Sequence, residues 1–234
     1  MSGTLWGIGV GPGDPELLTL KAVRLIAACP VLAYPAPENG ESLARAIAAP
    51  HVPAGKTECP IRLPIEIARH PARDAYDSGA AALAAHLDAG RDVALLCLGD
   101  PLFYGSYMYL HARLAERFVC RIVPGITSFA ASAALGGHAL AAREDSVAVV
   151  PATLPDAEIE RRIAAHDSLV FLKLGRHFGR LKGLLARLGL ADDALYVERA
   201  GMADERRAGL AAVTADTAPY FALVLVHRRK AAWL

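Results

Sequence analysis

The chain has 234 residues, 54% of them hydrophobic, and a formal net charge of +1 at pH 7. This balance supplies ample apolar material for one large domain or two smaller ones. It excludes a global electrostatic field that would attract nucleic acid or an anionic membrane. The sequence shows neither a signal-peptide pattern nor an apolar run near the ~20 residues that span a bilayer. We therefore expect a cytoplasmic protein with no nucleic-acid or membrane partner.

Short β-like runs alternate with helical stretches along most of the chain. The predicted strands cover residues 5–10, 31–34, 93–98, 121–123, 146–150, 169–174, 194–198 and 222–227. The predicted helices cover residues 15–28, 41–48, 73–87, 105–117, 128–135, 156–165 and 179–188. Several strands are apolar throughout, as expected where helices cover both faces of a sheet. The alternation predicts an α/β fold.

Proline and glycine mark the places where this alternation changes. Two proline-rich stretches, residues 35–39 and 50–64, interrupt it. Residues 118–125 run from a helix end through a strand to Pro124-Gly125. We place a domain boundary in that segment, which gives an N-terminal α/β domain over residues 1–121 and a C-terminal α/β domain over residues 122–234.

Several common motifs are absent from the sequence. The Gly9–Asp14 segment fails the dinucleotide fingerprint, because Asp14 stands at the last glycine position and Pro12 removes a backbone N–H. Gly55-Lys56-Thr57 lacks the first glycine of a phosphate-binding loop. There is no Cys-x-x-Cys pair, no His-Glu-x-x-His and no Gly-x-Ser-x-Gly. We expect no bound metal, and we interpret the four scattered cysteines as buried free thiols.

Three glycine-containing turns each follow an apolar strand directly. They are Gly9-Val10-Gly11-Pro12-Gly13-Asp14, Gly99-Asp100-Pro101 and Pro124-Gly125-Ile126-Thr127-Ser128. Ligands of parallel α/β sheets bind outside the carboxyl ends of the strands, where these turns are predicted to lie. Each turn alone could be a tight connection in which Asp or Thr caps the next helix. The repetition of the pattern three times favours a binding site.

Five motifs in order resemble the tetrapyrrole methylases, also called class III S-adenosylmethionine methyltransferases. They are residues 9–22, 99–101, 124–128, 171–175 and 198–200, so the resemblance covers essentially the whole chain. Residues 99–110 and 34–37 look like the branch that methylates precorrin-2 at carbon 20 in cobalamin biosynthesis. The resemblance implies two α/β domains with the cofactor in the cleft between them, in a homodimer.

The same resemblance carries the cofactor contacts over position by position. For S-adenosylmethionine it implies contacts from Pro12, Leu98, Gly99, Asp100, Phe103, Thr127, Ser128, Leu174, Ala200, Met202 and Ala203. Glu198-Arg199-Ala200 departs from the usual fifth motif, since Gly201 stands where threonine is common.

The expected chemistry is simple, because a methyl sulfonium is already activated and the protein has mainly to align donor and acceptor. A base could remove the proton from the methylated carbon, and Asp14, Asp100 and Tyr104 are the candidates. Asp14 and Asp100 are equally good helix caps.

The acceptor carries many carboxylates, which favours arginine and lysine around the site. The cations near the motifs are Lys21, Arg143, Lys173, Arg176, Arg180, Arg199, Arg206 and Arg207. We select Lys21, Lys173, Arg176 and Arg180 as substrate-binding candidates. Each of them could equally be a solvated surface charge.

Four alternative functions stay open at this point. A cobalt-containing substrate would need no different residues, because the metal would belong to the substrate. The string around Tyr104 argues against a relative that methylates a protein side chain in diphthamide synthesis. A non-catalytic module that senses S-adenosylmethionine would leave the basic residues without a purpose. A phosphate-binding nucleotide enzyme is disfavoured by the two failed motifs.

Overall fold

The structure is a computed structural model that describes residues 2–64 and 69–229. The chain forms two compact units, Met1–Thr127 and Ser128–Leu234, each with its own sheet. The division falls after Thr127 rather than after the expected residue 121, because the strand Val119–Val123 pairs with the first strand and so belongs to the first unit. The α/β fold class predicted from the sequence is confirmed.

The first unit contains a five-stranded sheet in the order β3-β2-β4-β1-β5. All its strand pairs are parallel. The strands are β1 (Thr4–Gly9), β2 (Val31–Pro37), β3 (Thr57–Leu63), β4 (Val93–Cys97) and β5 (Val119–Val123). Every residue of β4 is buried, as a strand with both faces covered requires.

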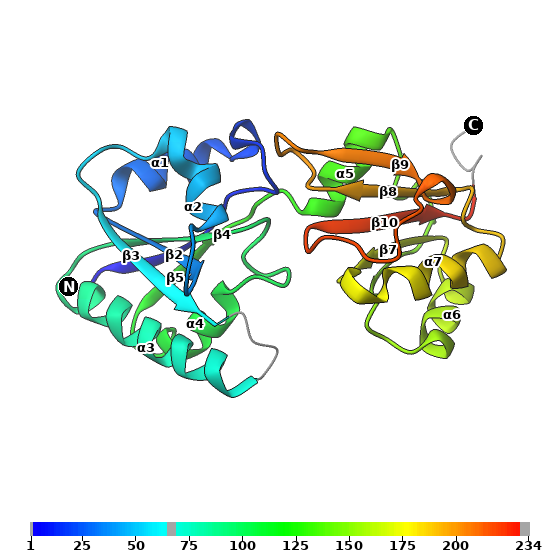
Figure 1. Ribbon diagram of the computed structural model, residues 1–234. Coiled ribbons are helices and arrows are strands. Elements are labelled where there is room, and N and C mark those ends of the chain that lie inside the picture. The colour runs from blue at the N-terminus through cyan, green and yellow to red at the C-terminus, as the bar shows by residue number, and fades with distance from the viewer. Residues whose placement is uncertain (1, 65–68, 230–234) are drawn as a thin grey trace. The chain divides into compact units, whose positions relative to one another are not determined.

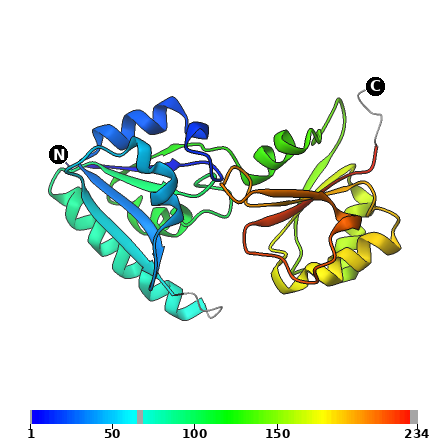
Figure 2. The same cartoon turned by 45° about the horizontal axis from the view of Figure 1, so that its top comes forward.

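Helices cover both faces of this sheet (Figures 1 and 2). One face packs against α1 (Leu20–Ala28) and α2 (Leu43–Ala48), and the other packs against α3 (Arg69–Asp88) and α4 (Tyr107–Leu114). The helix after β1 and the helix after β4 therefore lie on opposite faces, although the two strands are neighbours. Such a reversal opens a crevice at the carboxyl ends of the strands, where ligands of open α/β sheets bind.

The second unit contains a mixed sheet in the order β6-β7-β10-β8-β9. The strands are β6 (Val147–Pro151), β7 (Ser168–Leu172), β8 (Ala194–Glu198), β9 (Arg206–Gly209) and β10 (Ala222–His227). β10 runs antiparallel to both β7 and β8, so the carboxyl ends of those two strands lie at one edge. Helices α6 (Asp156–Ala165) and α7 (Phe178–Arg187) pack on one face, and α5 (Ser128–Gly136) lies on the other (Figure 1).

The structure differs from the sequence expectations in three elements. The proline-rich stretches are not irregular throughout, because β2 extends over Pro35–Pro37 and pairs with β3 inside the second stretch. The expected helix over residues 15–28 is a 3₁₀ turn, Pro15–Leu17, followed by α1. The break occurs because the Thr19 side chain accepts a hydrogen bond from Ala22 N at 3.1 Å and so starts a new helix. β9 was not expected, because it is only four residues long, Arg206 to Gly209, and none of them is buried.

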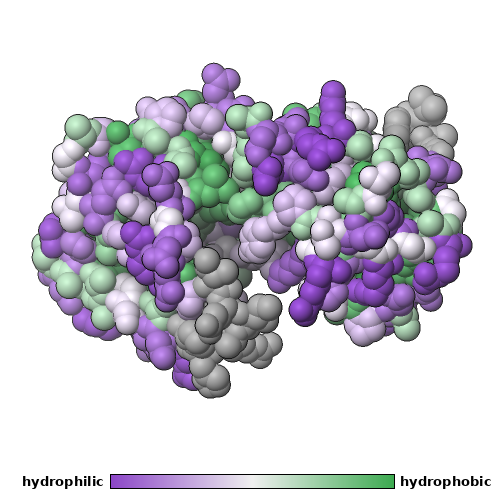
Figure 3. All heavy atoms as spheres, in the orientation of Figure 1, coloured by the Kyte–Doolittle hydropathy of each residue, from purple (hydrophilic) through white to green (hydrophobic). Residues whose placement is uncertain are grey.

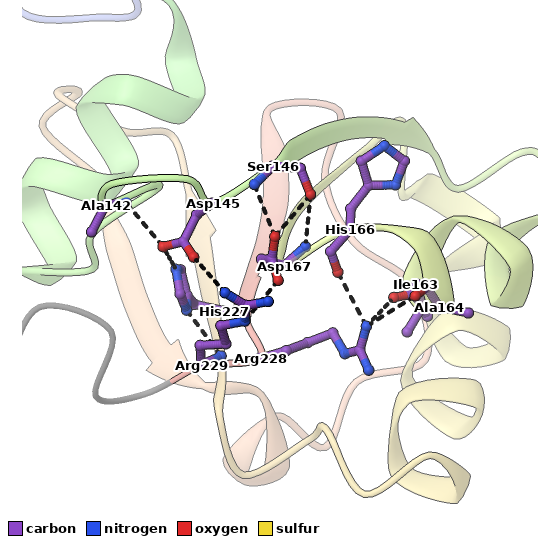
Figure 4. Close-up of polar contacts among 10 residues, drawn as sticks. All are labelled: Ala142, Asp145, Ser146, Ile163, Ala164, His166, Asp167, His227, Arg228 and Arg229. Atoms are coloured by element: carbon purple, nitrogen blue, oxygen red, sulfur yellow. Dashed lines mark hydrogen bonds and ion pairs between the residues drawn. The ribbon is translucent and has the colours of Figure 1, made fainter.

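The amino ends of β6 and β7 and the carboxyl end of β10 meet in a polar cluster, which Figure 4 shows. Its centre is His227, whose Nε2 lies 3.2 Å from Asp145 Oδ2, and both side chains are 2% exposed. Arg229 Nε donates to Asp167 at 2.9 Å, and Asp167 in turn accepts from Ser146. These contacts tie the last described residues to the sheet. No helix in the described part of the chain is long and apolar enough to cross a membrane.

Candidate active site

Three backbone turns touch one another at the carboxyl ends of β4, β1 and β5. A Cβ atom on Gly9 would lie 2.6 Å from the backbone of Gly125 and from Gly99 O. A Cβ atom on Gly125 would lie 2.1 Å from Gly99 O. Real Cβ atoms do not approach backbone so closely, so the sequence can form this arrangement only with glycine at both positions.

The first two turns are also joined by backbone hydrogen bonds. Gly99 N donates to Gly11 O at 2.8 Å, and Gly11 N donates to Gly99 O at 3.3 Å. Both residues have left-handed backbones, with φ of 75° at Gly11 and 65° at Gly99. Glycine adopts this conformation without steric cost. The result is a side-chain-free rim of main chain at the crevice described above, which is the kind of surface that lets a ligand approach backbone closely.

The carboxylate of Asp100 connects the second turn to the third. Its Oδ1 accepts from Leu102 N at 2.9 Å, and its Oδ2 accepts from Gly125 N at 3.0 Å. Both oxygens are therefore engaged by backbone N–H groups. A carboxylate held in this way positions the two turns relative to each other.

The other two predicted proton acceptors differ in their surroundings. Asp14 caps the 3₁₀ turn that follows it, with Oδ1 accepting from Glu16 N at 2.8 Å. This is the helix-cap alternative considered for it. Tyr104 is 51% exposed and packs edge-on against Phe103 with ring centroids 5.0 Å apart. Pro12, which precedes Asp14 in the first turn, is buried.

Left-handed backbone at non-glycine residues concentrates in the predicted motifs. The four described residues of this kind are Tyr104, Arg143, Lys173 and Arg199, with φ between 49° and 57°. Tyr104 follows the second turn, while Lys173 and Arg199 directly follow β7 and β8. Such residues cost about 1–3 kcal/mol each and cluster at binding and catalytic sites. Three of the four thus support the motif positions independently of any resemblance.

The predicted cofactor contacts of the second unit lie at the edge where β7 and β8 end. Leu174 is fully buried and Ala200 is 7% exposed. Arg199 N donates to Phe221 O at 2.7 Å, which ties the end of β8 to the start of β10. Beyond it, Met202 N donates to Arg199 O at 2.9 Å. The turn that carries Met202 and the exposed Ala203 is therefore ordered by backbone contacts.

Three further predicted cofactor contacts remain. Two of them lie where the first unit passes into the second, and one directly precedes the second turn. Thr127 is the last residue of the first unit and is half-buried. Ser128 is exposed at the start of α5. Leu98, at the end of β4, packs partly against the core beneath α1. These three residues lie within or directly before the glycine turns along the chain, and their contacts with a cofactor stay a prediction.

The four predicted substrate-binding cations separate into different environments. Lys21 is exposed on α1, with Nζ 6.0 Å from the centre of the Trp6 ring. Lys173 and Arg176 are exposed near the end of β7. The guanidinium of Arg180 is occupied by contacts within the protein. It pairs with Asp156 and donates to the carbonyl oxygens of Ala152 and Leu154. Arg180 therefore holds the segment between β6 and α6, and it is the weakest of the four candidates.

The structure also reveals a charged group that the sequence did not single out. Glu58 on β3 accepts from Arg45 Nη2 at 2.7 Å and from the Tyr34 hydroxyl at 2.6 Å. Hydrogen bonds from Arg45 lower the pKa of Glu58, and burial together with Glu58 raises the pKa of Tyr34 to about 12. Only the string at residues 34–37 could have indicated this place. The described residues contain no group of three or more His, Cys, Asp or Glu side chains that could hold a metal ion.

Comparison with known proteins defines the class to which this site belongs. The family model for tetrapyrrole (corrin/porphyrin) methylases matches residues 4–213. The chain therefore belongs to the tetrapyrrole methylase family, which confirms the resemblance found in the sequence.

Two individual relatives are similar to the chain over nearly its whole length. The chain is 45% identical to the cobalamin biosynthesis protein CobIJ of Mycobacterium tuberculosis, covering 98% of this chain and 47% of that protein. It thus spans about half the length of that relative. It is 43% identical to a precorrin-2 C(20)-methyltransferase of Sinorhizobium, over 96% of this chain and 95% of the other.

A solved structure agrees with this placement. The chain is similar to a uroporphyrin-III C-methyltransferase from Thermus thermophilus solved with S-adenosylhomocysteine, with 28% identity and a TM-score of 0.69. The similarity covers 96% of this chain and 97% of the other.

Proposed function

We propose that this protein transfers a methyl group from S-adenosylmethionine to carbon 20 of precorrin-2, giving precorrin-3A in cobalamin biosynthesis. One observation carries the proposal. The 43% identity to a precorrin-2 C(20)-methyltransferase extends over 96% of this chain and 95% of that relative, so no whole domain of the relative lies outside the match. The relative from Mycobacterium tuberculosis, a cobalamin biosynthesis protein, supports the same pathway. This chain matches 47% of that relative, so the rest of that protein has no bearing on the proposal.

The glycine turns fit a cofactor of this kind. Glycine at Gly9 and Gly125 lets the three turns pack backbone against backbone at the carboxyl edge of the first sheet, where a Cβ atom at either position would clash. We propose that Pro12, Leu98, Gly99, Asp100, Phe103 and Thr127 bind the cofactor there. Ser128, Leu174, Ala200, Met202 and Ala203 stay proposed contacts from the second unit.

The protein's task in this reaction is alignment. S-adenosylmethionine supplies an activated methyl group, and the acceptor carbon is itself nucleophilic. Holding the two at near-attack distance can lower the barrier by about 7–11 kcal/mol. The turn bearing Asp100 is fixed to Gly125 and to Leu102, so it presents a preformed surface rather than one that has to order on binding. Tyr104, which is 51% exposed beside this turn, is the proposed proton acceptor.

The decisive experiment is a turnover assay with purified protein, S-adenosylmethionine and precorrin-2, either metal-free or carrying cobalt. Mass spectrometry and the position of the new methyl group are the readouts. We expect one methyl at carbon 20, with faster turnover of the metal-free acceptor. Preference for the cobalt complex would move the protein to the corresponding step of a cobalt-dependent route. Tight cofactor binding without methylation of either acceptor would contradict the proposal and favour a sensor.

We further propose a homodimer that acts in the cytoplasm. All four cysteines are free thiols, as is usual in a reducing compartment. Light scattering at several concentrations measures the oligomeric state. A monomer at all concentrations would contradict the dimer without affecting the proposed reaction.

A further inference from the structure

Two strands of the first sheet stay paired with each other beyond the point where their pairing with the next strand ends. β2 pairs with β4 only as far as Ala33 opposite Leu95, whereas β2 and β3 stay paired to Pro37 opposite Leu63. Residues 34–37 and 60–63 therefore form a two-stranded ribbon, here named the β2–β3 overhang, beyond the pairing with β4. Because all these strands are parallel, the overhang projects from the same carboxyl edge as the glycine turns.

Side chains brace the overhang against the rest of the unit. The carboxylate of Glu58 holds both nitrogens of the Arg45 fork, at 3.0 Å from Nε and 2.7 Å from Nη2, and also accepts from Tyr34. This connects β3 to α2 and to the base of β2. On the other side, Ser42 Oγ donates to Pro35 O at 2.6 Å. β2 is thus held at Pro35 and β3 at Glu58, two residues before the overhang begins, so groups on the ribbon have a defined position.

Arg62 is the positive charge of the overhang. Its Nη1 donates to Pro37 O at 2.9 Å and to Gly40 O at 3.0 Å, so one nitrogen of the guanidinium is fixed by backbone. The residue is exposed, and no carboxylate in the described part of the chain forms an ion pair with it. A guanidinium carries five N–H donors in a rigid fork, which matches the two oxygens of a carboxylate. Arg62 is therefore held in place with its remaining donors available for an acidic ligand.

The position of Arg62 indicates which ligand it meets. In the sheet order β3 is two strands away from β4 and three away from β1, or about 10 Å and about 14 Å at the usual spacing between strands. The glycine turns follow β1, β4 and β5, so Arg62 stands on a strand that carries none of the proposed cofactor contacts of this unit. A large flat ring with acidic side chains on its rim would extend from the turns to the overhang.

We propose that Arg62 binds a peripheral carboxylate of the acceptor and so fixes the orientation of the ring against the glycine turns. This inference rests on the proposed function and extends it, because it assigns an acceptor-binding role to a residue outside the five motifs. Arg62 takes no part in the methyl transfer itself. Its effect is on acceptor binding and on which meso carbon faces the donor.

The variant Arg62→Gln tests this role. We expect the KM for precorrin-2 to rise roughly 10- to 100-fold, because a hydrogen bond to a charged group is lost. The kcat at saturating acceptor and the KM for S-adenosylmethionine should stay within about twofold of wild type. Arg62→Lys should fall between the two, because ammonium cannot form the paired bonds. Arg24→Gln, which removes another exposed arginine from the same unit, is the matched control and should leave both KM values unchanged.

A modified acceptor separates recognition from a structural effect. If Arg62 meets a carboxylate, the ratio of wild-type to Arg62→Gln affinity should collapse to about one with precorrin-2 whose acid side chains are amidated. The same ratio on both acceptors, or an unchanged KM in Arg62→Gln, would overturn the assignment while wild-type turnover leaves the proposed function intact. Absence of wild-type turnover on any tetrapyrrole would overturn the proposed function, and this inference with it.

Discussion

Asp100 Oδ2 accepts a hydrogen bond from Gly125 N at 3.0 Å, and this single contact joins two turns that lie 25 residues apart in the sequence. The other oxygen of Asp100 accepts from Leu102 N, which shapes the turn after β4. The carboxylate therefore holds together the rim on which the proposed cofactor site depends.

The first prediction concerns the replacement Asp100→Asn. An amide offers one acceptor oxygen where the carboxylate offers two, so one backbone N–H loses its partner and faces an NH₂ group. We expect a loss of about 1–3 kcal/mol in the free energy of unfolding, together with weaker S-adenosylmethionine binding. Urea unfolding and calorimetry measure the two effects. If the variant lost turnover while stability and cofactor affinity were unchanged, Asp100 would act as the base instead.

The second prediction concerns the space between the turns. Gly125→Ala places a Cβ atom against Gly99 O, where backbone cannot move aside cheaply. We expect the free energy of unfolding to fall by about 1–3 kcal/mol and cofactor binding to be largely lost. Gly209→Ala is the matched control, because a Cβ atom there meets nothing within 4 Å. Equal behaviour of the two variants would show that the close approach at Gly125 has no consequence.

The sequence predicted those turns of the candidate site that a short run of neighbouring residues identifies. An apolar strand followed by Gly and Asp identifies a turn, and Gly99-Asp100 was found in this way. No local pattern shows that Gly9 and Gly125 touch, because their contact depends on β1 lying between β4 and β5. The overhang was missed for a related reason. Proline weakens a strand prediction, yet Pro35 and Pro37 lie where β2 has lost β4 as a neighbour and needs fewer backbone donors.

Charged residues were the least predictable part of the site. Arg180 follows a family motif closely and was selected for the substrate, but its guanidinium is occupied by Asp156 and two carbonyl oxygens. Arg62 was not selected, because it stands in a segment interpreted as an interruption. Sequence proximity to a motif does not determine whether an arginine has already found acceptors within the fold.

The third prediction compares two left-handed residues, Tyr104 and Arg143. Glycine adopts a left-handed backbone without steric cost, which should raise the free energy of unfolding at either position. Its greater conformational freedom in the unfolded chain opposes this gain, so we expect a net increase of up to about 1 kcal/mol for each variant. If strain at Tyr104 serves the reaction, Tyr104→Gly should lower kcat at least tenfold, whereas Arg143→Gly should leave kcat unchanged.

A further variant resolves the role of the Tyr104 hydroxyl. Tyr104→Phe keeps the ring against Phe103 and removes only the oxygen. A kcat reduced as strongly as in Tyr104→Gly would assign proton transfer to the hydroxyl. Activity close to wild type would leave Tyr104 a packing role and contradict its selection as a base.

The fourth prediction concerns acid stability and the cluster of Figure 4. His138 lies beside it, with ring centroids of His138 and His227 6.5 Å apart, and its Nε2 is buried without a hydrogen-bond partner in the described part of the chain. Burial, and secondly the neighbouring His227, lower the pKa of His138. The charged groups in contact with His227 or with its partners are Asp145, Arg229 and Asp167.

The sign of the effect follows from proton counts. Between the lowered folded pKa of His138 and the unfolded value near 6.5, the unfolded chain binds more protons than the folded one. Stability therefore falls as pH decreases through this window, and it is regained above it. Replacing His138 with Phe removes this titration, so the free energy of unfolding should depend less steeply on pH between about 7 and 5 than in wild type. His177→Gln, which lies outside the cluster, should keep the wild-type slope in urea titrations. An identical slope in His138→Phe would mean that other groups, and not the buried His138, set the acid limit of the second unit.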